Sequence, residues 1–243
     1  QLLADHGRDW LAPLHALTPG GRFEFHRGFV TDATLPAPAL VAHGEALFRL
    51  APLLRCLALC DVEGVAPRLA GVPGPGRVTD LRLDAHSRER HPDAGLVTMH
   101  RPLTDAGAAA LAACPGLRRL RRLDLGDNRL RAGGARALAE SPYLGRLEEL
   151  LLWGNPVRAA GALAVVSSPR LGGLRQLDLS CCGLDGPAVA ALAASPGVGR
   201  LQVLRLGYNY FGHEGGAALV ESPYLAGLSS LRLTCTGLSA DDQ

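Results

Sequence analysis

The chain has 243 residues, of which 47% are hydrophobic and 5% aromatic, so it holds enough apolar side chain for a packed core and is not a disordered polymer. Basic and acidic residues nearly balance, and a formal net charge of +2 provides no strong attraction to nucleic acid or to an anionic membrane. No run of about 18 apolar residues is present, so we expect no membrane association.

All 25 basic residues are arginine and isoleucine is absent, which indicates the codon bias of a GC-rich bacterium. The spacing of the six cysteines matches neither a zinc motif nor a small disulfide framework. We therefore expect reduced, structural thiols and a cytoplasmic protein without metal or cofactor. Nucleophile elbows, phosphate loops and metal-ligand motifs are also missing, so the sequence predicts no catalytic residues.

Residues 1–29 are predicted to form an amino-terminal cap. The stretch LLADHGRDWLAPLHAL is a candidate amphipathic helix, and RFEFHRGFV follows it. Because a stacked array must cover its open end, we expect Trp10, Phe23, Phe25 and Phe29 to pack against the core rather than to bind a ligand.

Residues 30–119 are predicted to form irregular turns of an array. Three turns start 24 residues apart, at Val30, Leu54 and Val78. The next step, to Leu120, is 42 residues, which is 15 more than the later 27-residue turns, and we assign the surplus to an insertion at about 87–102. This region contains His86, His91 and His100. Their spacing fits no familiar ligand motif, so a solvated loop is favoured over a metal site.

Residues 120–243 contain a regular 27-residue repeat. The stretch LRRLDLGDNRL recurs four times, and its first leucines are Leu120, Leu147, Leu174, Leu201 and Leu228. A second marker has the same period, at Pro115, Pro142, Pro169, Pro196 and Pro223. The alternating leucines predict a short strand with a buried face. The Ala- and Leu-rich stretch after it predicts a helix that ends near the step before proline.

These stretches resemble the leucine-rich repeat L-x-x-L-x-L-x-x-N-x-L, in the helix-containing variant of ribonuclease-inhibitor-like proteins. The resemblance implies an α/β solenoid, a horseshoe with a parallel sheet on its concave face and helices on its convex face. The ninth position, at Asn128, Asn155 and Asn209, is expected to hydrogen-bond the turns, and Cys182 and Thr236 take this position in two copies. The stretches HGRDWLAPL, RFEFHRGFV and HGEALFRLAPL resemble, more narrowly, the leucine-rich repeat proteins of planctomycete bacteria. In those proteins an amino-terminal repeat-companion domain precedes this arrangement, and we expect it to lie upstream of Gln1 and so to be absent from this sequence.

The concave face is the predicted binding surface. Leu151 and Trp153 are unusual there, because large apolar side chains on a solvated sheet face are a mark of binding hot spots. We expect partner contacts from seven residues: Asp124, Leu151, Trp153, Asp178, Arg205, Tyr208 and Arg232. The alternative for Trp153 is that its side chain simply folds over neighbouring turns.

The favoured function is a non-catalytic protein-interaction module or scaffold that acts as a monomer. One alternative is a regulatory module of an enzyme, such as a GTPase-activating-like leucine-rich repeat protein, which would need a particular arginine or asparagine on an edge loop. A weaker alternative is nucleic-acid binding through Arg118, Arg119, Arg121 and Arg122. Arg121 and Arg122 have Asp124 and Asp127 as sequence neighbours. A solvated surface with ion pairs is therefore favoured over a phosphate-binding site.

Overall fold

The computed structural model describes residues 11–72, 75–83 and 102–238. Within these ranges the strands form one nine-stranded sheet in the order of the chain. The strands are β1 Arg22–His26, β2 Phe29–Pro36, β3 Cys56–Cys60, β4 Asp80–Arg82, β5 Arg122–Asp124, β6 Glu149–Leu151, β7 Gln176–Asp178, β8 Val203–Arg205 and β9 Ser230–Arg232. Each strand of the array is followed by a convex segment that leads to the next, as a solenoid requires.

The register of the parallel strands follows the leucine pattern. Ala33 of β2 pairs with Leu57, which pairs with Leu81, and Leu81 pairs with Leu123 across the 42-residue step. From β5 onward the pairing advances by 27 residues at each strand. The predicted alignment of the irregular and regular turns is therefore confirmed from β2 to β9.

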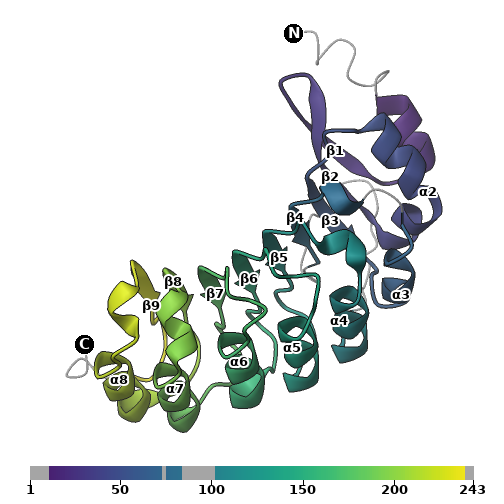
Figure 1. Cartoon of the computed structure of the whole chain (residues 1–243). Coiled ribbons are helices and arrows are strands. Elements are labelled where there is room, and N and C mark those ends of the chain that lie inside the picture. Colours follow the sequence, from purple (N-terminus) through teal and green to yellow (C-terminus); the bar gives the residue numbers. More distant parts are fainter. Residues whose placement is uncertain (1–10, 73–74, 84–101, 239–243) are drawn as a thin grey trace.

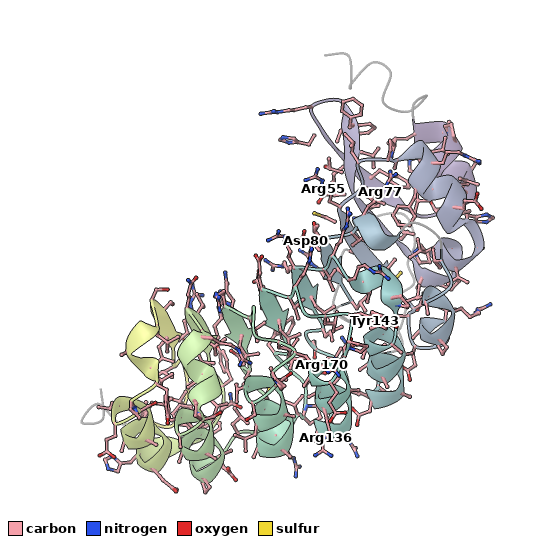
Figure 2. All side chains as sticks on the ribbon, in the orientation of Figure 1. Arg55, Arg77, Asp80, Arg136, Tyr143 and Arg170 are labelled. Atoms are coloured by element: carbon pink, nitrogen blue, oxygen red, sulfur yellow. The ribbon has the colours of Figure 1, made fainter. Side chains whose placement is uncertain are left out.

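Helices cover the outer side of the sheet (Figure 1). They are α2 Ala37–Leu50, α3 Ala66–Leu69, α4 Asp105–Ala112, α5 Ala132–Ala139, α6 Arg158–Val166, α7 Gly186–Ala193 and α8 Gly212–Val220. Because a helix is wider than a strand, stacked turns bend with the sheet on the inside of the curve, as Figure 1 shows. Figure 2 shows Asp80 on the sheet side and Arg136 on the helix side. The predicted α/β leucine-rich repeat solenoid is the observed fold.

The serine before three of the five repeat prolines ties its turn to the previous helix. The hydroxyls of Ser141 and Ser168 donate to the carbonyls of Ala112 and Ala139 at 2.5 Å, and Ser222 repeats the bond at 2.6 Å. These carbonyls lie in the last turn of a helix, where intrahelical partners are missing. The Ser-Pro step therefore both ends a helix and satisfies the helix before it.

The predicted asparagine ladder is present. Asn155 donates to the carbonyls of Leu125 and Leu152 at 2.8 and 3.0 Å and accepts from the amide of Leu130 at 2.9 Å. Asn128 and Asn209 make equivalent bonds in their turns. The buried turns thus keep their backbone groups paired where no sheet reaches them.

The amino-terminal hairpin differs in one respect from the predicted cap. Phe23 and Phe25 pack against the core, but Phe29 is 55% exposed, so its predicted packing role is wrong. Successive strand residues face opposite sides, and Val30 takes the buried position. A two-residue turn with positive φ at Arg27 and Gly28 joins β1 to the antiparallel β2. Trp10, His86, His91, His100 and most of the predicted insertion lie outside the described residues.

Candidate interaction surface

The parallel register arranges the concave side chains in rows across the sheet. The first row runs Asp32, Cys56, Asp80, Arg122, Glu149, Gln176, Val203 and Ser230. The second row lies two residues further along each strand and runs Thr34, Ala58, Arg82, Asp124, Leu151, Asp178, Arg205 and Arg232. Five of the seven predicted contact residues therefore share the second row.

A third line of residues follows the strands in the left-handed backbone region. The φ angle is +57° at Asp61, +53° at Asp127 and +57° at Tyr208. This conformation turns the amides toward the next turn of the array, and the Tyr208 amide donates to the Thr234 carbonyl at 2.7 Å. Tyr208 is consequently fixed to the edge of the sheet while its side chain is 59% exposed.

Two predicted contact residues are buried. Asp124 and Leu151 are each only 7% exposed, so their predicted roles as accessible contacts are wrong. The Asp124 carboxylate accepts a hydrogen bond from the Gly126 amide at 3.1 Å and lies 3.9 Å from Arg82 Nε. Leu151 lies between Asp124 and Asp178 in the second row. Strands about 4.8 Å apart let neighbouring side chains cover both residues, an effect that one repeat does not reveal.

Trp153 packs across the neighbouring turn. A Cβ placed on Gly126 would lie 2.0 Å from Trp153 Cε2, so the indole occupies the space that Gly126 leaves open. Gly126 is buried and Trp153 is half-buried. The indole therefore folds over the adjacent turn and still presents part of its surface on the concave side.

The remaining predicted residues are accessible to different degrees. Asp178 and Arg205 are half-buried and Arg232 is exposed. The structure adds Tyr210, which is 82% exposed and lies beside Gly237 of the next turn. Sequence reasoning missed Tyr210 because its position follows the asparagine, outside the strand columns.

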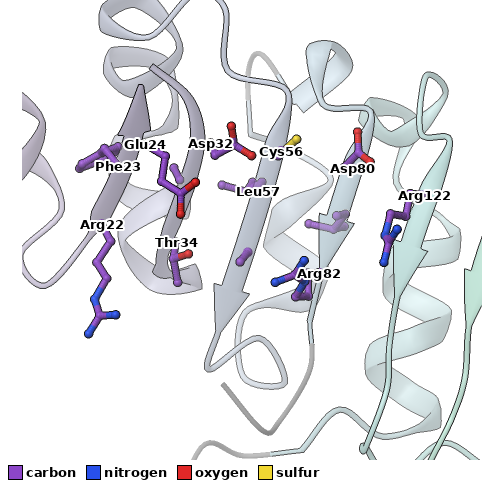
Figure 3. Close-up of a pocket in the computed structure, with 13 residues that line it drawn as sticks. Arg22, Phe23, Glu24, Asp32, Thr34, Cys56, Leu57, Asp80, Arg82 and Arg122 are labelled. Atoms are coloured by element: carbon purple, nitrogen blue, oxygen red, sulfur yellow. The ribbon is translucent and has the colours of Figure 1, made fainter. Parts of the chain in front are cut away.

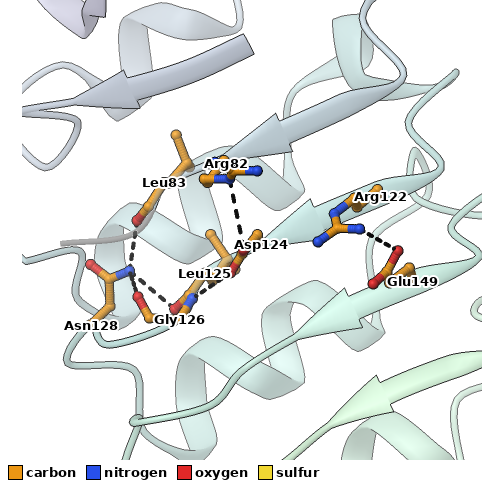
Figure 4. A network of polar contacts seen from close by, with 8 residues as sticks. All are labelled: Arg82, Leu83, Arg122, Asp124, Leu125, Gly126, Asn128 and Glu149. Carbon is orange, nitrogen blue, oxygen red and sulfur yellow. Dashed lines mark hydrogen bonds and ion pairs between the residues drawn. The ribbon is translucent and has the colours of Figure 1, made fainter. Parts of the chain in front are cut away.

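Arginine and glutamate side chains pair between β5 and β6. Arg122 Nη1 lies 2.9 Å from Glu149 Oε2, and Arg121 pairs with Glu148 in the same way. Figure 4 shows the Arg122–Glu149 pair next to the Arg82–Asp124 contact. The acidic sequence neighbours Asp124 and Asp127 are not the partners in these two pairs, because residues 27 apart lie opposite each other in the array.

A cleft of about 560 Å³ lies on the concave face where the hairpin meets β3, β4 and β5. Figure 3 shows its walls, with Arg22 and Glu24 on β1 and Arg82 on β4. Thr34 and Ala58 line its base, and their small side chains leave the space above the sheet open. The sequence predicted strands here but no cleft, because the wall formed by β1 is outside the repeat.

Burial decides the chemistry of the thiols. Desolvation raises the pKa of Cys182 to about 12, and its Sγ donates to the Leu152 carbonyl at 3.2 Å. Burial, a hydrogen bond to Asp32 and the charge of Asp80 raise the pKa of Cys56 to about 12. Both cysteines are thus held as neutral thiols at neutral pH, and Cys182 acts as a substitute for the turn asparagine.

In the described part of the chain, no three His, Cys, Asp or Glu side chains are grouped so that they could hold a metal ion. Among the same residues, no helix is long and apolar enough to cross a membrane.

The comparison with protein families matches part of the repeat. Residues 117–139 and 174–193 match the family model described as Leucine Rich repeat. No curated protein matches the chain. Yeast Rad7, solved in complex with Elc1, is 13% identical over 88% of this chain and 72% of its own, with a TM-score of 0.42. The internalin inlF from Listeria monocytogenes is 11% identical over 95% of this chain and 63% of its own, with a TM-score of 0.41. With its 27-residue turns, asparagine ladder and parallel sheet, the chain has the α/β leucine-rich repeat fold.

Proposed function

We propose that the chain is a non-catalytic protein-interaction module whose concave face holds a protein partner. One observation carries the proposal: Trp153, Arg205, Tyr208 and Arg232 present accessible side chains along β6 to β9 on a single hydrogen-bonded sheet. Trp, Tyr and Arg are the residue types that contribute most to protein interfaces.

The backbone supports these side chains in a way that favours binding. Arg205 lies between Asp178 and Arg232 in the register of the hydrogen-bonded strands. The backbone amide of Tyr208 donates to the Thr234 carbonyl and so anchors this residue. Side chains on a paired sheet need little further ordering when a partner arrives, so less binding free energy is lost. We therefore propose Trp153, Asp178, Arg205, Tyr208 and Arg232 as the contact patch.

Asp124 and Leu151 have a supporting role in this proposal. Their burial means that they shape the floor beneath the patch and contribute little area to a partner. Substitution of Asp124 would act on binding through the position of Arg82, which its carboxylate contacts.

The finer expectations from the sequence belong to the same proposal: a monomer in the cytoplasm and a planctomycete source. Sedimentation of the purified chain tests the monomer, and the genome that encodes it tests the source.

The experiment is affinity capture from a lysate of the source organism, with captured proteins quantified for three forms of the chain. An Arg205→Ala/Tyr208→Ala variant should lose the specific partner. Tyr224→Ala is the matched control, because Tyr224 is 37% exposed and lies outside the patch, and it should capture as the wild type does. Equal capture by all three forms would reject the patch.

A further inference from the structure

In the cleft beside the hairpin, carboxylates lie in the first row and arginines on the side of the second, apart from Arg122, which lies in the first row beside Asp80 and pairs with Glu149. Glu24 of β1 lies opposite Asp32 of β2 in the strand register, and Asp80 lies two strands further along the first row. Arg22 and Arg82 lie on the side of the second row, with small Thr34 and Ala58 between them. Figure 3 shows this division across the cleft.

The carboxylates of the cleft are not neutralised by the chain itself. Asp32 accepts a hydrogen bond from the Thr31 hydroxyl at 2.6 Å, and Asp80 accepts one from Thr79 at 2.7 Å. None of the ion pairs between described residues includes Glu24, Asp32 or Asp80. Neutral hydroxyl donors leave the negative charge in place, so these carboxylates attract a cation.

Cys56 lies between Asp32 and Asp80 in the first row. Burial is the main cause of its raised pKa, the two carboxylates raise the pKa further, and Arg82 lowers it. The charge that acts at the centre of the row is therefore mainly negative. On the other side of the cleft, the Arg82 side chain is 56% exposed, and its Nε lies 3.9 Å from the Asp124 carboxylate, which is longer than a hydrogen bond. The guanidinium can therefore still donate to a second anion.

From this charge pattern we infer that the cleft binds an extended segment of a protein partner that carries a basic side chain and, two residues away, an acidic one. The two rows are two residues apart along each strand, which is about 6.6 Å. Alternate side chains of an extended segment have the same separation and point to the same side. The basic group lies over Asp32 and Asp80, and the acidic group meets Arg82. This inference rests on the proposed function, since it names the chemistry of the partner.

The test is an NMR titration of the whole chain with blocked peptides. The probe is Ac-Thr-Arg-Thr-Glu-Thr-NH2, compared with peptides that carry Gln-Thr-Gln or Glu-Thr-Glu at the same positions. The Arg-Thr-Glu peptide should shift amides of β2 to β4 at millimolar concentrations, and the other two should bind more weakly. Asp32→Asn/Asp80→Asn should weaken its binding about fivefold, the scale of two exposed ion pairs. Glu140→Gln/Glu221→Gln removes two exposed charges outside the cleft and should leave binding unchanged.

Equal binding of the three peptides, no binding of the Arg-Thr-Glu peptide, or full affinity in the Asp32→Asn/Asp80→Asn variant would overturn the inference. If that variant does not fold, the three peptides on the wild-type chain still decide the matter. Partner capture that depends on Arg205 and Tyr208, without peptide discrimination, would reject the cleft and keep the proposed function. Peptide discrimination with capture that is independent of both residues would reject the patch instead.

Discussion

Trp153 and Gly126 show how one residue's missing side chain makes room for another residue's large one. The indole lies in the space above Gly126, in the turn 27 residues earlier. The sequence revealed Trp153 as an unusual concave residue, but not its direction, because the choice of side-chain rotamer depends on the neighbouring turn. The same limit applies to Asp124, which is buried and whose carboxylate contacts Arg82 and the Gly126 amide.

Gly126→Ala should displace the Trp153 indole and destabilise the fold by about 1–3 kcal/mol, the usual cost of an added group in a packed site. Urea unfolding measures the stability, and tryptophan emission should move to longer wavelength as the indole gains solvent. Gly64→Ala is the control, since a Cβ there meets nothing within 4 Å. Unchanged emission in Gly126→Ala would show that the indole lies elsewhere.

Cys182 connects stability to pH. Its pKa rises from 9.0 to about 12 on folding, so between these values the unfolded chain loses a proton that the folded chain keeps. The free energy of unfolding should then fall as pH rises above about 9, by up to about 1.4 kcal/mol per pH unit for this thiol.

In Cys182→Ala this fall in the free energy of unfolding should be smaller. Urea unfolding measures it at several pH values between about 8 and 11, a range that begins below the unfolded-state pKa of 9.0 and stays below the folded-state value of about 12. Cys181→Ala is the matched control, because that neighbouring thiol is exposed, and it should retain the wild-type dependence. A Cys182→Ala curve parallel to the wild type would contradict the burial of the thiol.

At the scale of elements, a regular turn consists of a strand, a turn with Asn or, in two copies, Cys182 or Thr236 at its ninth position, and a helix that ends before a Ser-Pro step. The 27-residue period predicted all three, since both markers repeat without interruption from Pro115 onward. It did not predict the exposure of Phe29, because the hairpin of β1 and β2 has no second copy with which to compare it. It also could not show the hydroxyl bond to the previous helix, which joins residues 29 apart.

Ser168→Ala should lower the free energy of unfolding by about 1–3 kcal/mol, because the buried Ala139 carbonyl loses its partner. Ser167→Ala, at the exposed neighbouring position, should change stability by less than about 0.5 kcal/mol. Thermal or urea unfolding compares the two, and equal effects would mean that the hydroxyl ladder contributes nothing.

At the scale of the whole molecule, the sheet carries the two proposed binding regions, which differ in origin. The patch on β6 to β9 comes from repeat columns, so five of its residues could be selected from the sequence. The cleft on β1 to β5 needs the hairpin as a wall and small residues in the irregular turns, and neither feature has the 27-residue period. At the last strand, Leu231 is 38% exposed whereas the equivalent Leu204 is fully buried, which shows how much each turn depends on its neighbour.

The most direct test of the central claim is the affinity of the captured and purified partner, measured by calorimetry against four forms of the chain. Arg205→Ala/Tyr208→Ala should weaken binding by about 2 kcal/mol or more, as truncation of hot-spot residues does. Trp153→Phe should weaken it less, and Tyr224→Ala should bind as the wild type does. Wild-type affinity in the double variant, with its fold intact, would contradict binding through the concave face of β6 to β9.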